Sequence, residues 1–330
     1  METARRIKLQ DRPLVMRGLF PATVTPFTSS LAIDFRALEN HFREMASTPG
    51  VSGIVVNSGI GERIQLTLDE CDLCIALALR VRRPDQVIVA GIDGRSTTDY
   101  VHAGQRARAA GAQALLVMPP FDARPYRRMA SYAPTVHAFF ATLDREVGLP
   151  MVVFQYPPNS GCAYPNAVLR GLCGIPNVVA VKVATMGDMQ AYAEVWDAFK
   201  DDLAVLAGVD SPPLIDMLRY GAHGALIGIS AILPHVWADL LRLIDEDAQD
   251  PADRLYDRVC RPLMASVFEN QQPKRLSSEV AATKEALAML GRIPNALVRP
   301  FALGADSAAR AEIRAALLGA GLLSSAAAAE

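Results

Sequence analysis

One lysine of this chain lies in a segment where a charged side chain is costly. Lys182 sits within the apolar, β-branched run 178–184, which is typical of a strand buried on both faces. Burial disfavours the charged amine and lowers its pKa, so that a neutral, nucleophilic amine is available near pH 7. Such an amine condenses with a ketone or a 2-oxo acid to a Schiff base, and the protonated imine accepts the electron pair of a neighbouring bond that breaks. The sequence therefore predicts Schiff-base chemistry at Lys182.

The alternative for Lys182 is a structural role, in which a buried carboxylate pairs with its charge. We favour the catalytic role, because a charged lysine in such a run is expensive and seldom stabilises a fold. The other lysines lie among polar neighbours and are expected to be solvated: Lys8, Lys200, Lys274 and Lys284.

Residues that often bind metals do not form a recognisable site. Cys71 and Cys74 have C-x-x-C spacing, but they lie on a predicted helix without a second pair, so we expect them to pack in the core. The histidines show no H-x-x-x-H spacing and are expected to be structural: His41, His102, His137, His223 and His235. No metal is predicted.

Composition excludes several classes of protein. The chain has 330 residues, 51% of them hydrophobic and 21% charged, so it is too apolar to be disordered. Its formal net charge of −2 gives no basic field for nucleic acid. No run of about 18 apolar residues predicts a membrane span, and residues 1–13 lack the apolar segment of a signal peptide. Five cysteines suit a reducing cytoplasm, where we expect the protein to work.

Apolar runs recur along the chain at the spacing of strand–helix units. Their starts are roughly 25 to 35 residues apart, and helix-like stretches such as 68–82 and 98–110 lie between them. Eight such units predict an α/β fold, a closed (β/α)8 TIM barrel. A doubly wound sheet is less favoured, because no G-x-G-x-x-G follows a first strand. The runs are 18–25, 53–57, 87–91, 114–118, 151–155, 178–183, 203–207 and 225–229.

The pattern changes toward the end of the chain. After about residue 240 it becomes helical, with an amphipathic segment at 281–291 that ends in a glycine. We expect a lead-in at 1–14, the barrel with its active site at 15–240, a helical extension at 241–320 and a low-complexity tail at 321–330.

Several motifs, in order and at matching spacing, resemble those of one family. They are the first-strand segment Phe20–Phe27 (FPATVTPF), Gly61 and Glu62 after the second strand, the loop Pro157–Gly161, Lys182 itself, and the segment Lys284–Phe301. The chain resembles the superfamily of dihydrodipicolinate synthase and N-acetylneuraminate lyase, which are class I aldolases. The resemblance covers about residues 15–305.

The resemblance implies a TIM barrel with a C-terminal helical extension and places Lys182 at the Schiff-base position. It implies a small 2-oxo acid as substrate, no metal or organic cofactor, and a homo-oligomer, either a dimer or a tetramer.

The chain departs from the family's pattern at the residues that move protons. The usual tyrosine at the end of the fifth strand is Phe154, and the usual pair of threonines after the second strand is Gly59 and Ile60. The tyrosine that dihydrodipicolinate synthases pass between subunits aligns with Phe121, and their carboxylate-binding arginine with Asn159. Lysine biosynthesis is therefore not expected.

Other groups near the predicted strand ends are candidates to complete the site. Tyr156 follows Phe154 by two positions, so it either presents a phenol to the same pocket or packs in the loop. Ser58 and the backbone N–H groups of Gly59, Ile60 and Gly61 are candidates to hold a carboxylate, with Asn57 as a further polar candidate.

Two carboxylates have structural alternatives. Asp210 is expected either to hold the distal hydroxyls of a substrate or to cap the next helix. Glu62 is expected to anchor its loop by hydrogen bonds rather than to act as an acid. Four arginines are candidates to reach an anionic substrate: Arg12, Arg17, Arg63 and Arg95.

These observations predict a lyase of the aldolase type that forms a Schiff base with a pyruvate-type 2-oxo acid. Lys182 forms the imine, the 58–61 loop holds the carboxylate beside Phe154, and Tyr156 or a water moves protons. One alternative is a hydratase or dehydratase that acts on a keto-deoxy sugar acid through the same imine. Another is a barrel that binds a 2-oxo acid without catalysis.

Overall fold

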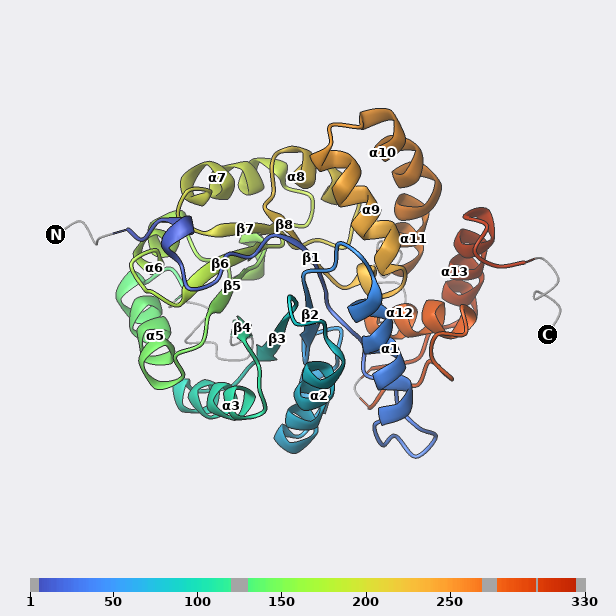
Figure 1. Cartoon of the computed structure of the whole chain (residues 1–330), viewed down its shortest axis with the longest axis horizontal. Coiled ribbons are helices and arrows are strands. Elements are labelled where there is room, and N and C mark those ends of the chain that lie inside the picture. Colours follow the sequence, from blue (N-terminus) through green and yellow to red (C-terminus); the bar gives the residue numbers. More distant parts are fainter. Residues whose placement is uncertain (1–5, 120–129, 269–277, 301, 325–330) are drawn as a thin grey trace.

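Strands and helices alternate along the chain in the computed structural model, which describes residues 6–119, 130–268, 278–300 and 302–324 (Figure 1). Eight strands pair in parallel in the order β1-β8-β7-β6-β5-β4-β3-β2. Parallel bridges from Leu19 to Val51 and from Ala22 to Val55 join β1 to β2. The predicted (β/α)8 barrel is thus confirmed. The strands are β1 (Gly18–Pro21), β2 (Gly53–Val56), β3 (Val87–Ile92), β4 (Ala114–Val117), β5 (Met151–Gln155), β6 (Val178–Val183), β7 (Ala204–Ala207) and β8 (Gly224–Ile227).

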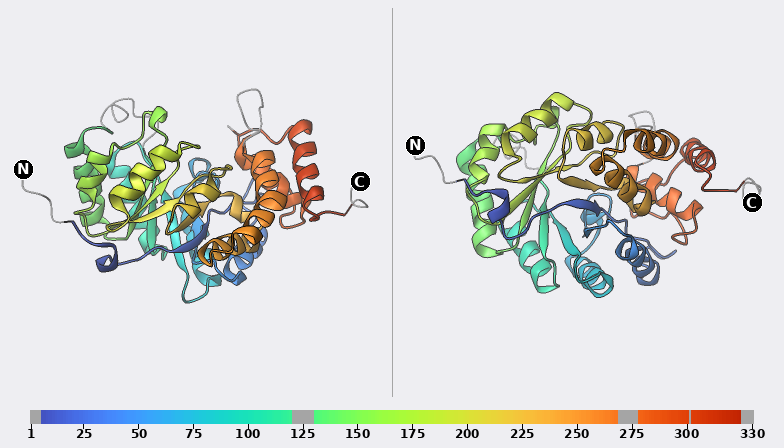
Figure 2. Two further views of the ribbon diagram at one scale, coloured as in Figure 1. Left: turned by 90° about the horizontal axis from the view of Figure 1, so that it is seen from above. Right: turned by 45° about the horizontal axis from the view of Figure 1, so that its top comes forward.

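Helices surround the strands (Figure 2). Side-chain caps mark the starts of some of them. Thr67 and Glu70 form a capping box at the start of α2, and Ser96 with Asp99 forms another at α3. The helices between the strands are α1 (Phe35–Ser47), α2 (Leu68–Val81), α3 (Thr97–Ala109), α5 (Ala133–Glu146), α6 (Asn166–Leu172), α7 (Met189–Phe199) and α8 (Leu214–Arg219).

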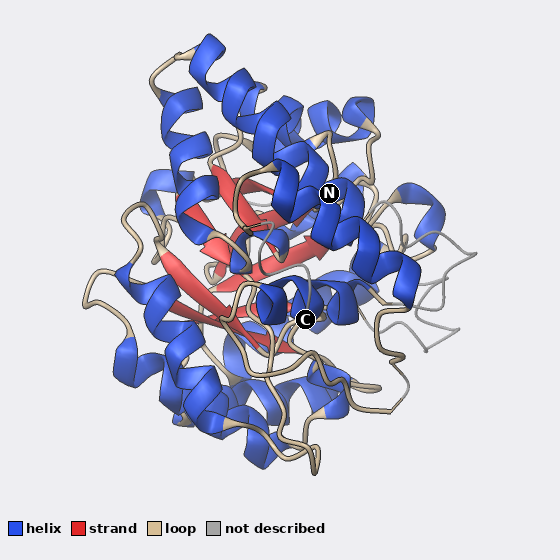
Figure 3. Ribbon diagram, turned by 90° about the vertical axis from the view of Figure 1, so that its right-hand side faces the viewer, coloured by secondary structure: helices blue, strands red, loops and turns tan. Residues whose placement is uncertain are grey.

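The C-terminal helices gather on one side of the barrel, away from the N-terminal lead-in (Figure 1), and Figure 3 shows them from that side. The segment predicted at 281–291 is α12, which begins two residues earlier at Glu279. A π-helical turn, Tyr256–Cys260, joins α10 to α11. The helices of this part are α9 (Pro234–Asp245), α10 (Gln249–Leu255), α11 (Arg261–Val267), α12 (Glu279–Met289) and α13 (Ser307–Gly319).

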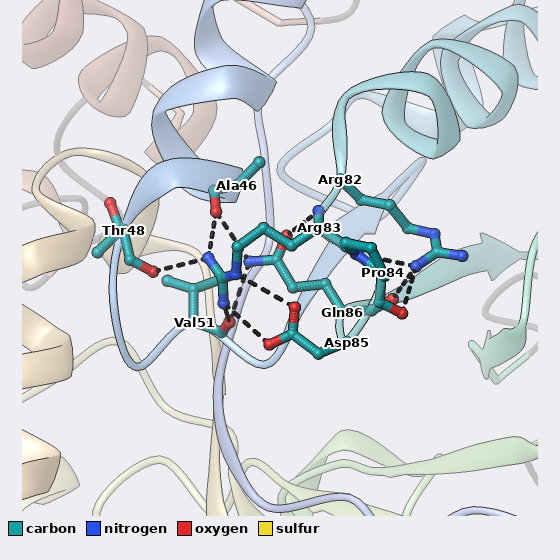
Figure 4. A network of polar contacts seen from close by, with 8 residues as sticks. All are labelled: Ala46, Thr48, Val51, Arg82, Arg83, Pro84, Asp85 and Gln86. Atoms are coloured by element: carbon teal, nitrogen blue, oxygen red, sulfur yellow. Dashed lines mark hydrogen bonds and ion pairs between the residues drawn. The ribbon is translucent and has the colours of Figure 1, made fainter.

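A polar network supports the barrel wall where β1 and β2 share few hydrogen bonds (Figure 4). The Arg83 guanidinium donates to the carbonyl of Val51 at 2.9 Å, and the amide of Gln86 donates to the same carbonyl at 3.0 Å. Gln86 also donates to the carbonyl of Ala46 at 3.2 Å. These bonds satisfy buried carbonyls at the turn before β2, which would otherwise cost free energy.

The lead-in places its arginines at the N-terminal ends of the strands, far from where barrel active sites lie. Arg12 is buried and donates to the carbonyls of Ile175 and Cys173, each at 2.7 Å, and of Asp202 at 3.0 Å. Arg17 is exposed just before β1. The expectation that these two arginines reach a substrate is wrong, because the chain enters the barrel from the opposite end.

The cysteines are buried, as the predicted core packing of Cys71 and Cys74 requires. All five cysteines are buried and free, and burial raises the pKa of Cys71 to about 11. Within the described ranges, no three His, Cys, Asp or Glu side chains gather in a way that would hold a metal ion. No helix in those ranges has the length and apolar character needed to cross a membrane.

Candidate active site

A cavity of about 450 Å³ opens at the C-terminal ends of the strands. That end is where a barrel of this type places its chemistry. Its described wall combines apolar side chains, such as Leu116, Met118 and Met186, with a few ionisable ones. The ionisable side chains are Lys182 from β6, Tyr156 after β5, Asp210 after β7 and Glu279 at the start of α12.

Lys182 points into this cavity and is only 8% exposed. Its Nζ lies 4.1 Å from the centre of the Phe154 ring, on the neighbouring strand. No carboxylate in the described part of the chain forms an ion pair with it. Burial lowers the pKa of Lys182, and the more distant carboxylates of Asp210 and Glu279 oppose that effect. The structure therefore supports a desolvated amine rather than a paired structural lysine.

A glycine makes room for the Lys182 side chain. A Cβ atom on Gly208, just after β7, would lie 2.6 Å from Cγ of Lys182 and 2.9 Å from the carbonyl oxygen of Val183. Because real atoms do not approach so closely, a side chain at this position would displace the lysine from its path to the cavity.

Tyr156 and Phe154 both line the cavity, in agreement with the first of the two alternatives for Tyr156. Their ring centres are 4.3 Å apart, with the planes inclined by 37°. Burial raises the pKa of the Tyr156 phenol, with smaller effects from Glu279 and Cys162. The phenol therefore stays protonated at neutral pH and can donate a hydrogen bond, but it is a poor base.

The loop after β2 contributes three of its four predicted residues. Ser58, Gly59 and Ile60 line the cavity, and the buried Oγ of Ser58 has no hydrogen-bond partner within the described chain. Gly61 is absent from the described wall, because it packs against the segment after β1, where the hydroxyl of Thr25 donates to its carbonyl at 2.8 Å. An unsatisfied buried hydroxyl on a residue of the cavity wall is a group that a ligand can satisfy.

Asn57, by contrast, is a structural residue. It adopts a left-handed backbone with φ of 56°, and its side-chain amide donates to the carbonyl of Cys71 at 3.1 Å. It therefore joins the loop to α2 and is not part of the described cavity wall.

Glu62 anchors its loop by hydrogen bonds, as predicted, but its partners lie in the C-terminal part of the chain and not within the loop. Its carboxylate accepts from Nζ of Lys284 and, at 3.0 Å, from the backbone N–H of Arg299. Lys284 also donates to the carbonyl of Leu297 at 2.8 Å and lies 4.1 Å from the ring centre of Phe27.

Lys284 is fully buried, so the prediction that it is solvated is wrong. Most faces of α12 are buried, so its polar residues Thr283 and Lys284 are both fully enclosed. Burial lowers the pKa of Lys284 to about 8, although Glu62 raises it.

The structure excludes one of the two alternatives for Asp210, the cap of the next helix. It lines the cavity, but it does not cap α8, the next helix, whose first turn has no side-chain cap. Its Oδ1 instead accepts from the backbone N–H of Ile229 at 2.7 Å, at the start of the short turn after β8. Burial raises the pKa of Asp210, and Lys182 lowers it.

Glu279 is the ionisable side chain of the cavity that sequence reasoning missed. It is the first residue of α12, almost a hundred positions after Lys182, and no spacing rule links the two. Burial raises its pKa most, Asp210 raises it further, and Lys182 lowers it. The one available signal was the capping serine at position 278, which marks a helix start but not its place over the barrel.

The expectation that Arg63 and Arg95 reach a substrate is also wrong. Arg63 is committed to an ion pair with Asp93 at 3.1 Å, and Arg95 is exposed before α3. Neither of them belongs to the described cavity wall, and neither does Asn159, which is exposed. Phe121 lies outside the described residues.

The sequence and the fold match one family over almost their whole length. The model of the dihydrodipicolinate synthetase family matches residues 15–319. The chain belongs to this family. This membership supports a lyase.

Curated relatives in this family are of similar length. The chain is 30% identical over 313 residues to a 4-hydroxy-tetrahydrodipicolinate synthase of Chelativorans sp. (strain BNC1), a match that covers 94% of this chain and 100% of the relative. It is 28% identical over 309 residues to the enzyme of that name from Phenylobacterium zucineum (strain HLK1), covering 94% of this chain and 99% of the relative.

Solved structures share the fold. The dihydrodipicolinate synthase from Aquifex aeolicus has a TM-score of 0.80 at 24% identity, covering 93% of this chain and 99% of that one. The wild-type sialic acid aldolase of Ruminococcus gnavus has a TM-score of 0.78 at 16% identity, covering 92% of this chain and 97% of that one.

Proposed function

We propose that the protein is a lyase that forms a Schiff base between Lys182 and a pyruvate-type 2-oxo acid. The observation that carries this proposal is the state of Lys182. Its amine is desolvated, it faces a cavity at the active end of the barrel, and no described carboxylate pairs with it. Burial lowers the pKa of such an amine, which increases its neutral, nucleophilic fraction.

The steps follow from the chemistry of the amine. The neutral Lys182 amine adds to the C2 carbonyl of the 2-oxo acid, and loss of water gives a protonated imine. The imine nitrogen then accepts the electron pair of a bond at C3, either a C–H bond or the bond to the rest of the substrate. Reprotonation and hydrolysis return the amine.

The neighbouring groups suit the two polar ends of such a substrate. The hydroxyl of Ser58 and the backbone at Gly59 and Ile60 offer donors for the carboxylate. The phenol of Tyr156 is the proposed donor that assists the departure of water, and the Phe154 ring shields the imine from bulk water.

We further propose that lysine biosynthesis is not the role of this chain. Position 154 carries no hydroxyl next to Lys182, and the described cavity wall contains no arginine for the carboxylate of a second substrate. The described wall is instead mainly apolar.

We also propose a homo-oligomer, a dimer or a tetramer, that works in the cytoplasm. The resemblance to the aldolase superfamily supports the oligomer, and five free cysteines suit a reducing compartment. Sedimentation of the purified chain measures the oligomeric state.

Reductive trapping tests the proposed chemistry. The protein is incubated with borohydride and each of several 2-oxo acids, and its intact mass is measured. Pyruvate is expected to add about 72 Da, the mass of a reduced imine. The adduct should be lost in Lys182→Met and kept in Lys200→Met, which changes a partly exposed lysine. If none of the 2-oxo acids gives an adduct, the proposal is contradicted and a non-catalytic binding barrel is favoured.

A further inference from the structure

The cavity contains one carboxylate that has no structural task in the described chain. The Glu279 side chain lines the cavity and is exposed to it, and it makes no hydrogen bond or ion pair with another described residue. The nearby glutamates differ in this respect. Glu62 is held by Lys284 and the backbone of Arg299, and Glu70 is paired with the Arg299 guanidinium.

The helix that carries Glu279 is firmly placed. Ser278 caps α12 by accepting from the backbone N–H of Ala281 at 3.2 Å. Five positions after Glu279, Lys284 is fully buried and bonded to Glu62 in the loop that lines the same cavity. These contacts hold the first turn of α12 over the strand ends, so the carboxylate of Glu279 stays within the site.

The proposed chemistry needs a base, and the other ionisable groups suit this task less well. The Phe154 ring has no proton to exchange, and the Tyr156 phenol is protonated at neutral pH. Asp210 is engaged through Oδ1 with the backbone N–H of Ile229 at 2.7 Å. The nitrogen of Lys182 is consumed in the imine itself.

We propose that Glu279 is the catalytic acid–base of this cavity and moves the proton at C3 of the bound substrate. The inference rests on the proposed imine at Lys182. The Glu279 carboxylate removes a proton from C3, and the electron pair of that C–H bond forms the C2–C3 double bond. The electrons of the C=N bond move to nitrogen, which gives a neutral enamine and a protonated Glu279. The reverse step returns the proton to C3.

The surroundings of Glu279 fit this role. Burial and Asp210 raise the pKa of its carboxyl group, which brings the group closer to the operating pH of a general base. Lys182 lowers that pKa and so opposes these two effects. A glutamate that served only to stabilise the start of α12 would not require a position in the cavity.

Exchange of the C3 protons of pyruvate tests the proposal without knowledge of any second substrate. The full chain is incubated with pyruvate in D₂O, and loss of the methyl proton signal is followed by NMR. Glu279→Gln should slow this exchange by about a hundredfold or more, while borohydride trapping on Lys182 stays within about twofold of the wild-type yield. Glu285→Gln, on the same helix and paired with Arg310, should leave the exchange rate unchanged.

A second variant separates a chemical role from a structural one. In Glu279→Ala, added formate should restore exchange in proportion to its concentration, because a small carboxylate can occupy the vacated space. Lys182→Met should show no such recovery.

The experiments distinguish failure of the imine at Lys182 from failure of the role of Glu279. If wild-type protein gives no adduct with pyruvate, the proposed function fails at the imine. If the adduct forms but Glu279→Gln or Glu279→Ala exchanges protons within about threefold of the wild-type rate, the role of Glu279 is refuted while the imine stands.

Discussion

Removal of the buried Lys284 amine should destabilise both the C-terminal helices and the loop beside the cavity. Lys284 is fully buried, and its partner Glu62 is only 3% exposed. Lys284→Met keeps a chain of similar length but leaves the Glu62 carboxylate with a single described donor, the backbone N–H of Arg299 at 3.0 Å. Removing one partner of a buried ion pair costs about 3 to 5 kcal/mol of folding stability, because the charge of the other partner stays buried without compensation. We expect the free energy of unfolding to fall by that amount.

The measurement is urea denaturation followed by circular dichroism, with the double variant Lys284→Met, Glu62→Gln beside the single one. The neutral amide still accepts from Arg299 but no longer leaves a buried charge, so the double variant should recover about 2 kcal/mol of the loss. Lys200→Met is the control, because its weak ion pair with Asp197 is largely solvated; it should change stability by less than about 0.5 kcal/mol. A loss below about 1 kcal/mol in Lys284→Met, or strictly additive effects in the double variant, would refute the reasoning.

Two further predictions concern the proton relay and the stability at acidic pH. Phe154→Tyr places a phenol where the ring centre lies 4.1 Å from Lys182 Nζ, so imine trapping by pyruvate should proceed about tenfold faster; an unchanged rate would show that the missing hydroxyl does not limit this step. His41 is buried, and neither of its ring nitrogens has a hydrogen-bond partner among the described residues. Burial lowers the pKa of His41 to about 4. Because the unfolded chain binds this proton at higher pH than the folded chain, stability should fall by about 3 kcal/mol as the pH drops from about 6.5 to 4. His41→Leu should flatten that dependence in urea titrations, and parallel curves for the two proteins would contradict the assignment.

The barrel was predictable because its strands are continuous apolar runs that differ from the helices around them. The runs predicted at 151–155 and 178–183 coincide with β5 and β6. The first run was predicted too long, since regular pairing ends at Pro21 and only a single bridge from Ala22 follows. Local pattern thus fixes the type of an element more reliably than its end.

The site was predictable where its residues follow a strand and not where they come from elsewhere. Tyr156, Ser58 and Asp210 follow strands β5, β2 and β7, and the cavity includes all three. Glu279 and Lys284 come from α12, and Lys284 meets Glu62 across 222 positions of sequence. Packing of one part of the fold on another decides such contacts, and no periodicity within α12 indicates which face meets the barrel.

Peptide mapping of the trapped protein tests the central claim most directly. After reduction with pyruvate present, trypsin should fail to cleave at the modified Lys182, so residues 171–200 should appear as one joined peptide that is about 72 Da heavier. An imine at Lys182 requires that this peptide carries the adduct and that the adduct disappears in Lys182→Met. An unmodified peptide 171–182, with the adduct absent or on another lysine, would contradict it.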